Sequence, residues 1–476
     1  MYERKEITSA QLEEQRGYCE RIRDRLADRP HFALVETYGC QQNESDSEIL
    51  RGWLMDCGYG LTADPGQADL IAVNTCAVRE HAELRVFGNV GALNHRKAKN
   101  PDLIVAVGGC MVQQEVVQER LRKSFPVVDL AFGPHELWRF PELLWRTMER
   151  REHCSRKSQR RLIAAEPSSG VVAEGLPRQR DGGIKAWLSI MNGCDNFCTY
   201  CIVPHVRGRE RSRRPEDVLA EARSLAAAGY KDITLLGQNV NSYGKGLGGD
   251  VDFPELLRRI GDVPGDFVLR FMTSHPKDAT EKLFRAMAET EKCAHHIHLP
   301  AQSGSSRVLK AMTRHYDREK YLDTVAMARS ILPDLVLTTD IIVGFPGETE
   351  AEFEETLSLV EQVRYDAMFT FIYSPRTGTP AASLPDPVSR AEKQVWFDRL
   401  LASANRISAE KHAEYVGKTC RVLVDGVTND PARNLSARTK GGRLVHLAGD
   451  PALVGQFTDA EITDSSTWAL FGHTAE

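Results

Sequence analysis

The stretch GCDNFCTYC, residues 193–201, places three cysteines in a Cys-x3-Cys-x2-Cys spacing. Thiolates are soft ligands that suit zinc or an iron–sulfur cluster. A structural zinc site uses four ligands, whereas a cubic cluster held by only three thiolates leaves one iron open to bind a substrate. The spacing therefore predicts a [4Fe-4S] cluster on Cys194, Cys198 and Cys201. A zinc site completed by His205 is the alternative.

On both sides of this loop, predicted strands alternate with helices over residues 180–411. The strands are IKAWLSIM, DITLLG, FVLRFMTS, HHIHLP, LVLTTDIIVGFP and AMFTFIYSP, and the clearest helices are PEDVLAEARSLAAAGY, SSRVLKAM and EAEFEETLSLVEQV. So many βα units predict a barrel or partial barrel, whose chemistry lies at the carboxyl ends of the strands.

A second strand–helix alternation occupies residues 31–149 and predicts a doubly wound parallel sheet. Its strands HFALVE, ADLIAVN and DLIVAVGG are followed closely by Cys40, Cys76 and Cys110. Loops at the carboxyl ends of parallel strands emerge at one edge of the sheet, so the three thiols are expected to share a ligand site. A small buried residue at each strand end is the alternative.

The remaining segments are expected to be simpler. Residues 1–30 are charged, are expected to be a helical extension and lack the apolar stretch of a signal peptide. Residues 150–179 are basic and then rich in Pro, Gly and Ser, which predicts a linker. Residues 413–475 contain CRVLVDGV, GRLVHLAG and QFTDAEIT, which predict a small antiparallel β-barrel.

Composition narrows the class of protein. The chain has 476 residues, a net charge of -5 and 11 cysteines, an odd number that argues against a disulfide framework. No run of about 18 apolar residues occurs, so no transmembrane helix is expected. A cytoplasmic location is the default expectation.

The cysteine spacing, with an aromatic residue before the last cysteine, resembles the signature of the radical S-adenosylmethionine (SAM) superfamily. The ordered motifs are similar to those of the methylthiotransferase family, and within it to the MiaB-type branch that acts on tRNA. They span roughly residues 31–475 and read TYGCQQNESDSE, NTCAVREHA, GGC, MNGCDNFCTYCIVPHVRGRERSR, LLGQNVNSYG, TSHPKD, HIHLPAQSGS, DIIVGFPGET and FIYSPRTGTPAA. The family joins a three-cysteine N-terminal domain to a radical SAM core and a C-terminal TRAM domain. In that last domain NLSARTKGGRLVHL departs from the usual Thr-Gly-Arg-like run.

The resemblance implies two [4Fe-4S] clusters, one on each cysteine triplet, and SAM as a cofactor. In the family, SAM bound to the open iron of the core cluster is split to a 5′-deoxyadenosyl radical, and a second SAM methylates a sulfur on the N-terminal cluster. The implied reaction adds a methylthio group at carbon 2 of an isopentenylated adenosine adjacent to the anticodon. A threonylcarbamoyl adenosine substrate is the alternative within the family. A zinc-dependent RNA-binding protein without catalysis is the alternative of another class.

The resemblance also implies site residues and partners. Tyr200 matches the residue near the adenine of SAM, and other SAM contacts are expected at strand ends, with ordinary packing as the alternative for each. These expected contacts are Gly237, Gln238, Asn239, Ser274, Gln302, Ser303, Ile342 and Gly344. The planar guanidinium of arginine binds phosphate through paired hydrogen bonds, so contacts with tRNA are expected at five arginines after the cysteine loop. These are Arg207, Arg209, Arg211, Arg213 and Arg214, and a solvated charged face is the alternative. The partners are a tRNA anticodon stem-loop, an electron donor such as flavodoxin or ferredoxin, and a sulfur source.

Overall fold

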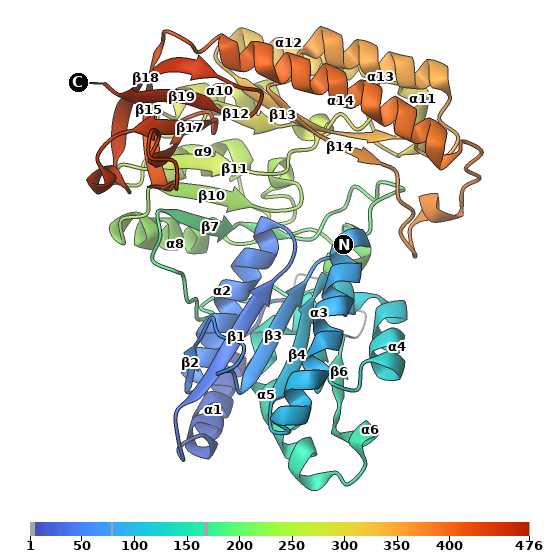
Figure 1. The fold of residues 1–476 in the computed structure, drawn as a ribbon, viewed down its shortest axis with the longest axis vertical. Coiled ribbons are helices and arrows are strands. Elements are labelled where there is room, and N and C mark those ends of the chain that lie inside the picture. The colour runs from blue at the N-terminus through green and yellow to red at the C-terminus, as the bar shows by residue number, and fades with distance from the viewer. Residues whose placement is uncertain (1–4, 78–79, 166–169, 476) are drawn as a thin grey trace. The chain divides into compact units, whose positions relative to one another are not determined.

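A computed structural model describes residues 5–77, 80–165 and 170–475 and divides the chain into two compact units (Figure 1). Residues 1–4 of the expected extension, 78–79 of NTCAVREHA and 166–169 of the expected linker lie outside the described residues. The first unit consists of residues 1–182, 191–195 and 201–213, and the second of residues 183–190, 196–200 and 214–476. The chain therefore passes between the units within the three-cysteine loop.

The first unit contains a six-stranded sheet in the order β2-β1-β3-β4-β5-β6, and all of its strand pairs are parallel. The strands are β1 (His31–Thr37), β2 (Tyr59–Leu61), β3 (Leu70–Thr75), β4 (Ile104–Gly109), β5 (Leu130–Phe132) and β6 (Leu162–Ala164). Every residue of β3 and β4 is buried, as expected for central strands covered on both faces.

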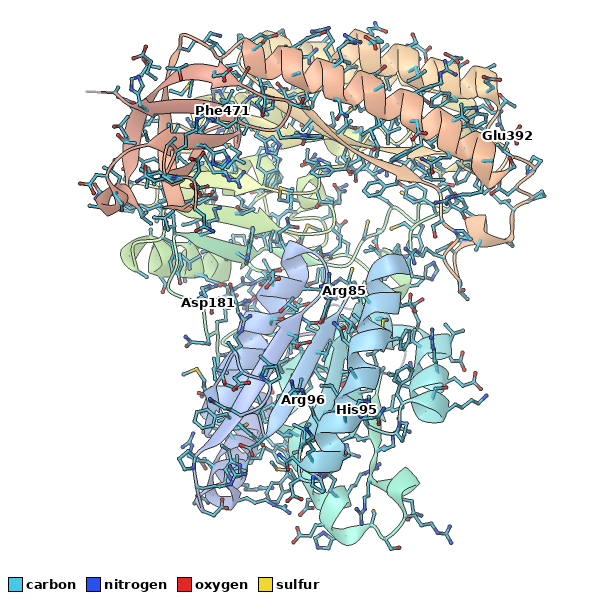
Figure 2. The ribbon with its side chains drawn as sticks, viewed as in Figure 1. Arg85, His95, Arg96, Asp181, Glu392 and Phe471 are labelled. Atoms are coloured by element: carbon cyan, nitrogen blue, oxygen red, sulfur yellow. The ribbon has the colours of Figure 1, made fainter. Side chains whose placement is uncertain are left out.

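Two apolar layers confirm that this sheet is doubly wound. One layer, which includes Trp53 and Phe140, packs the sheet against α1 (Ser9–Arg25), α2 (Gln41–Asp56) and α5 (Phe140–His153). The other, which includes Phe87 and Leu121, packs it against α3 (Glu80–Lys99) and α4 (Glu115–Ser124). Figure 2 marks His95 and Arg96 near the end of α3, where both side chains are exposed.

Residues 150–179 are more than a linker, which corrects the expectation from composition. The helix α5 continues to His153, α6 spans Lys157–Arg160, and β6 joins the sheet beside β5. A strand of only three residues, Leu162–Ala164, carries too few side chains to show an alternating pattern. The N-terminal extension is also part of the core, because α1 buries Cys19 and Ile22.

The second unit contains a partial (β/α) barrel, as the sequence predicts. Parallel sheets β7-β10-β11 and β12-β13-β14 are joined by a parallel bridge between Leu269 and Cys293. The strands are β7 (Lys185–Ser189), β10 (Asp232–Leu236), β11 (Val268–Phe271), β12 (His296–His298), β13 (Val336–Val343) and β14 (Ala367–Ile372). The helices are α8 (Pro215–Ala227), α9 (Phe253–Gly261), α10 (Glu281–Glu289), α11 (Ser306–Ala311), α12 (Arg318–Ile331), α13 (Glu350–Val363) and α14 (Arg390–Ala413). Glu392, labelled in Figure 2, closes the capping box that begins α14.

The C-terminal segment forms a closed five-stranded barrel in the order β15-β16-β17-β19-β18. Its strands are β15 (Thr419–Val427), β16 (Leu435–Thr439), β17 (Leu444–Ala448), β18 (Phe457–Ser465) and β19 (Leu470–Thr474). The small barrel is confirmed, but it is not wholly antiparallel, because β17 pairs with β19 in parallel. The chain crosses to β18 between these two strands, and that crossover reverses the direction in which β19 arrives.

The turn between β16 and β17 docks on the partial barrel, which accounts for its unusual sequence. Arg270 of β11 donates hydrogen bonds to the carbonyl oxygens of Lys440 and Thr439, at 2.7 and 3.2 Å. A Cβ on Gly441 would lie 2.6 Å from a methyl carbon of Val336, so only glycine fits there. The TKGGR turn thus fastens the small barrel to the larger one.

Candidate active site

The first cysteine triplet lies at the carboxyl ends of the adjacent strands β1, β3 and β4. Cys40 is the N-cap of α2, Cys76 directly follows β3, and Cys110 begins the 3-10 helix η1 (Cys110–Gln113). A hydrogen bond with Cys76 and the positive charge of Arg207 lower the pKa of the Cys40 thiol. Gly39 has a φ of 135°, and a Cβ there would lie 2.5 Å from the Cβ of Cys76, so this approach requires glycine.

Buried amides tie the three loops together. Asn43 donates from Nδ2 to the carbonyl oxygen of Thr75 at 2.8 Å, and Asn74 donates to the carbonyl oxygen of Asn43 at 2.8 Å. The Sγ of Cys40 donates to Oδ1 of Asn43 at 3.4 Å. Both amides lie within the quoted motifs, but sequence reasoning assigned them no role. Their positions next to Cys40 and Cys76 were the available signal.

Arg207 also belongs to this cysteine site. It ends α7 (Val203–Arg207), is 5% exposed and donates from Nε to Sγ of Cys110 at 3.1 Å. Its Nη2 reaches Oδ2 of Asp46 at 2.7 Å. Burial works against the charge, but Asp46, Cys110 and Cys40 outweigh it, so the pKa of Arg207 is raised. The expectation that Arg207 grips phosphate is not supported, because its guanidinium is turned inward.

The other loop arginines have different surroundings. Arg213 is buried and pairs with Glu174 through two bonds of 2.6 and 2.7 Å, which also argues against a phosphate contact. Arg209 and Arg211 are half-buried, and Arg214 is exposed. Arg211 donates to the carbonyl oxygens of Arg209 and Arg207 at 2.6 and 3.3 Å, so its guanidinium is also bound within its own loop. Arg209 and Arg214 remain candidates for a nucleic-acid contact.

The second cysteine triplet lies in the loop after β8 (Met191–Asn192). Cys194 and Cys198 are buried and Cys201 is half-buried. Main-chain bonds hold the loop, since Cys194 N donates to Gly208 O at 3.2 Å and Thr199 N donates to Met312 O at 3.1 Å.

A buried arginine, Arg314, anchors this loop from α11 and the turn that follows it. Arg314 is 4% exposed and donates from Nη1 to Sγ of Cys198 and to the hydroxyl of Tyr200, both at 3.3 Å. Its Nη2 donates to Pro300 O at 3.1 Å, and its Nε donates to the Tyr316 hydroxyl at 3.0 Å. Sequence reasoning missed Arg314, because nothing in KAMTRHY distinguishes it from a surface arginine.

Four of the expected SAM contacts come together at the end of β13. Tyr200 and Ile342 pack against one apolar cluster, and Ile342 N donates to Gln302 O at 2.9 Å. Gly344 follows directly, with a φ of 70°, and donates its N–H to Glu348. Burial raises the pKa of Glu348 to about 7. These residues can therefore line one small-molecule site.

The other expected contacts divide into two groups. Gly237, Gln238 and Asn239 follow β10, and Asn239 accepts from His275 N at 3.1 Å, which brings it beside Ser274. Ser303 instead lies against α13, where its hydroxyl contacts Thr356 Oγ1 at 3.3 Å and caps Ser305 N at 3.1 Å. Ser303 therefore has a structural role in this fold.

The donor chemistry fits the groups that the sequence implies. Within the described part of the chain, the buried polar atoms near the strand ends that lack a protein partner include Ser274 Oγ, Gln302 Oε1 and Glu348 Oε1. SAM carries ammonium, hydroxyl and amine groups that such atoms can bind. Thiols suit iron–sulfur clusters. Among the described residues, no three His, Cys, Asp or Glu side chains are grouped closely enough to hold a metal ion as they stand.

The inner face of the partial barrel also carries polar and aromatic side chains. His298 contacts Thr338 Oγ1 at 3.0 Å and Asp340 Oδ1 at 3.5 Å. Phe369 of β14 meets the His298 ring edge-on at 5.9 Å and is 52% exposed. An exposed aromatic ring beside a carboxylate and an imidazole can receive a flat heterocycle.

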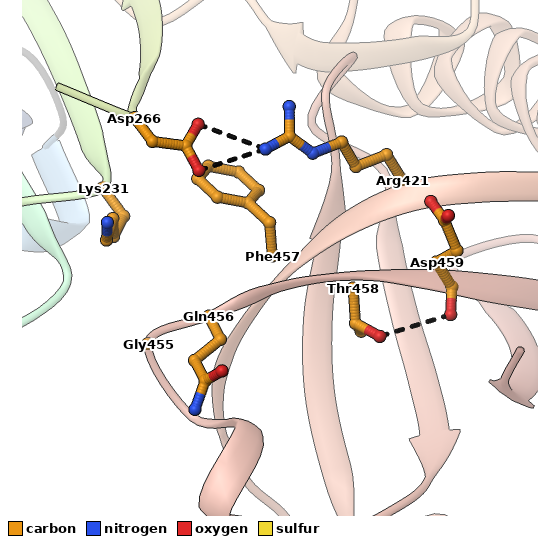
Figure 3. Close-up of a pocket in the computed structure, with 8 residues that line it drawn as sticks. All are labelled: Lys231, Asp266, Arg421, Gly455, Gln456, Phe457, Thr458 and Asp459. Carbon is orange, nitrogen blue, oxygen red and sulfur yellow. Dashed lines mark hydrogen bonds and ion pairs between the residues drawn. The ribbon is translucent and has the colours of Figure 1, made fainter. Parts of the chain in front are cut away.

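A polar pocket of about 400 Å³ lies where β15 and β18 approach the partial barrel (Figure 3). Asp266 accepts two bonds of 3.1 Å from Arg421, whose guanidinium lies 4.4 Å from the ring centre of Phe457. The residues that line it are Lys231, Asp266, Arg421, Gly455, Gln456, Phe457, Thr458 and Asp459.

The three-cysteine loop, together with the partial (β/α) barrel that follows it in the sequence, identifies the class of this protein as a radical SAM enzyme with two further domains. Family models agree, because residues 188–360 match the Radical SAM superfamily, residues 33–133 match the uncharacterized protein family UPF0004, and residues 413–475 match the TRAM domain.

Curated relatives narrow the class further. The chain is 46% identical to the tRNA-2-methylthio-N(6)-dimethylallyladenosine synthase of Thermoanaerobacter sp. strain X514, over 99% of this chain and 98% of that protein. It is 50% identical to the synthase of the same name from Clostridium botulinum strain Langeland, over 92% of this chain and 96% of that protein. The chain belongs to the tRNA-2-methylthio-N(6)-dimethylallyladenosine synthase family.

Solved structures support the fold alone. The radical SAM methyltransferase TsrM from Kitasatospora setae matches with a TM-score of 0.53 at 16% identity, over 74% of this chain and 77% of that chain. Separately, no helix in the described ranges is both long and apolar enough to cross a membrane.

Proposed function

We propose that this protein uses SAM to add a methylthio group at carbon 2 of an isopentenylated adenosine next to the anticodon of tRNA. The proposal depends on the 46–50% sequence identity, over nearly the full length of the chain, to relatives named for this modification. These names favour the isopentenyl substrate over the threonylcarbamoyl one. The radical SAM match argues against a zinc-dependent RNA-binding protein without catalysis.

The proposal needs a radical, because the carbon–hydrogen bond at carbon 2 is unactivated and acid–base chemistry does not break it easily. A [4Fe-4S] cluster on Cys194, Cys198 and Cys201, with SAM bound, would supply that radical. Tyr200 and Ile342 would hold the adenine of SAM by apolar contact. Ser274 and Gln302 would satisfy their unpartnered oxygens on the polar groups of SAM. These contacts position SAM and exclude water.

A second [4Fe-4S] cluster is proposed on Cys40, Cys76 and Cys110, where it would carry the sulfur that is methylated and transferred. Three thiols from three strand ends leave the fourth coordination position open, which is what a sulfur carrier requires. Asn43 and Asn74 would keep the loops in register while the sulfur is replaced.

We propose that the substrate adenine enters the partial barrel beside Phe369. Base–aromatic stacking contributes about 1–3 kcal/mol per base, and the exposed ring of Phe369 offers such a face. His298 and Asp340 would form hydrogen bonds with the edge of the base. Because stacking is tolerant of sequence, the polar pair would provide the discrimination.

Two surfaces are proposed to hold the tRNA itself. One is formed by Arg209 and Arg214 after the cysteine loop. The other lies on the TRAM barrel, where Phe471 (labelled in Figure 2) stacks on His446 with ring centres 5.9 Å apart and Arg433 covers its ring at 4.2 Å. Cationic and aromatic groups in this arrangement suit single-stranded loops of RNA.

The chemistry also requires partners that supply electrons and sulfur. We propose a small electron-transfer protein of the flavodoxin or ferredoxin type, a separate sulfur source and a cytoplasmic location, where the tRNA substrate would be available. An electron donor is needed because the proposed reaction cleaves SAM reductively. A sulfur source is needed because each turnover transfers one sulfur atom to the tRNA.

Mass spectrometry of tRNA nucleosides tests the proposal. Tests of a deletion strain and of the reconstituted protein on isopentenylated tRNA should show that the 2-methylthio isopentenyl nucleoside requires this protein. Loss of only the methylthio threonylcarbamoyl nucleoside would favour the other substrate. Unchanged methylthio nucleosides in the deletion strain would overturn the proposal.

A further inference from the structure

Arg207, the first arginine of the RGRERSR run, touches a cysteine sulfur with its guanidinium. It follows Cys201 by six residues, yet the segment 201–213 packs with the first unit. Ile202 and Val206 form a buried apolar cluster with Ala77 and Cys110. The short segment after Cys201 therefore places the positively charged side chain of Arg207 at the site of Cys110.

The contacts of Arg207 make this cation a fixed part of the site. Its Nε lies 3.1 Å from Cys110 Sγ, while Nη2 is 2.7 Å from Asp46 Oδ2 and 3.4 Å from Asn43 Oδ1. Nη1 lies 3.4 Å from Asn192 Oδ1. Asp46 and Asn43 both lie on α2, directly after Cys40. The anchoring carboxylate therefore aims the Nε donor at Cys110.

A simple ion pair does not account for this arrangement. An arginine at the surface could pair with Asp46 without being buried. Burial of a charge is unfavourable unless other groups compensate for the lost hydration. Part of the compensation for Arg207 comes from the sulfur of Cys110, which is expected to be a thiolate ligand of the cluster. Hydrogen bonds and positive charge at cluster sulfurs are among the factors that set the reduction potential of an iron–sulfur cluster.

We propose that Arg207 is a positioning residue for the N-terminal cluster, which donates a charge-assisted hydrogen bond to the Cys110 thiolate and thereby raises the reduction potential of that cluster. The inference rests on the proposed function, because it requires a cluster on Cys40, Cys76 and Cys110. It goes beyond that function by giving the core loop a role in the electronic properties of the other site.

The test uses the full-length chain with Cys194, Cys198 and Cys201 all replaced by Ala, so that only the N-terminal cluster is observed. Potentiometric titration with electron paramagnetic resonance then measures its midpoint potential with Arg207, in R207Q and in R207K. The matched control is R139Q, because Arg139 lies in the same unit and pairs with Glu136 and Glu142. Iron content and chemical unfolding are measured for each variant.

The expected result is that R207Q makes reduction about tenfold less favourable, which is about 59 mV for a one-electron couple. R207K, which keeps the charge but loses the fork geometry, should lie between R207Q and the parent. R139Q should match the parent. Equal potentials in R207Q, R207K and the parent, at equal iron content, would overturn the inference.

Two further outcomes also decide the matter. If R207Q loses its iron while R207K keeps it, at unchanged folding stability and with the potential of the parent, positive charge only retains the cluster and the inference is wrong. If R207Q and R207K lose iron and folding stability together, Arg207 is only structural and the inference is wrong. A parent protein that binds no cluster at all would refute the proposed N-terminal cluster itself, which is a different failure.

Discussion

The two cysteine triplets are built in opposite ways. Cys194, Cys198 and Cys201 lie within eight residues, and main-chain bonds together with Arg314 hold their loop. Cys40, Cys76 and Cys110 are 36 and 34 residues apart (76−40 and 110−76), and they lie at one edge of the sheet only because β1, β3 and β4 are adjacent. The first site is local and the second depends on tertiary structure. Damage to the surrounding fold should therefore affect the two sites unequally.

The largest effects are expected when one cysteine ligand is removed from each of the two sites. C198A should abolish both SAM cleavage and methylthio product, because the core cluster initiates the chemistry. C110A should retain SAM cleavage but lose the methylthio product by at least 100-fold, on the order of 3 kcal/mol. Liquid chromatography of 5′-deoxyadenosine and of tRNA nucleosides measures both. Full product formation by C110A would contradict the proposed division of roles.

The next largest effect is expected at Arg314, which anchors the local site. R314Q removes hydrogen bonds to Cys198, Tyr200 and Pro300, and bonds from a charged donor contribute about 1.5–3 kcal/mol each before compensation. The free energy of unfolding should fall by about 3 kcal/mol, as measured by urea denaturation. R329Q is the control, since Arg329 contacts only Arg364 O among its described hydrogen bonds. An equal loss in both variants would contradict a special role for Arg314.

A smaller effect should follow from N43A, which loosens the loops of the tertiary site. It leaves the buried carbonyl of Thr75 without its 2.8 Å donor, at a cost of about 2 kcal/mol. Iron should be lost selectively from the N-terminal site, while the core cluster and SAM cleavage remain. N94A is the matched control, because Asn94 is exposed and, among the residues that the structure describes, bonds only to the nearby Gly91 O. Equal iron in N43A and N94A would show that the amide does not hold the loops.

The smallest expected effect concerns acid. Burial, followed by the charge of Arg270, lowers the pKa of His296 in the partial barrel to about 3, against about 6.5 when unfolded. Below pH 6.5 the unfolded chain takes up a proton that the folded chain does not, so the stability is complete above this pH and falls as the pH drops toward 3. H296N should lose about 1 kcal/mol less than wild type between pH 7 and pH 5.5. Urea titrations at both pH values, with H473N as an exposed control, would show no difference if His296 titrates normally.

The long strands could be predicted because their signals are local, and the two cysteine triplets stay predicted ligand sites, one from its spacing and the other from three strand ends. Apolar runs that stop shortly before Cys40, Cys76 and Cys110 mark the ends of three strands. Parallel pairing brings these strand ends to one edge of the sheet. The short strands β2, β5 and β6 were missed, since three residues cannot show a period.

The roles of Arg207 and Arg314 could not be predicted, because each depends on distant partners. RGRERSR reads as a uniform basic run, yet Asp46, 161 residues earlier, draws Arg207 inward. Cys198 and Arg314 are separated by 116 residues. A sequence shows that a charge is present, but its partner is decided by the tertiary fold.

One chain is proposed to carry two separate clusters, and iron quantification combined with Mössbauer spectroscopy tests this most directly. Anaerobically reconstituted wild-type protein should contain about eight iron atoms per chain, and the variant with Ala at Cys40, Cys76 and Cys110 should contain about four. About four iron atoms in both proteins would contradict the account.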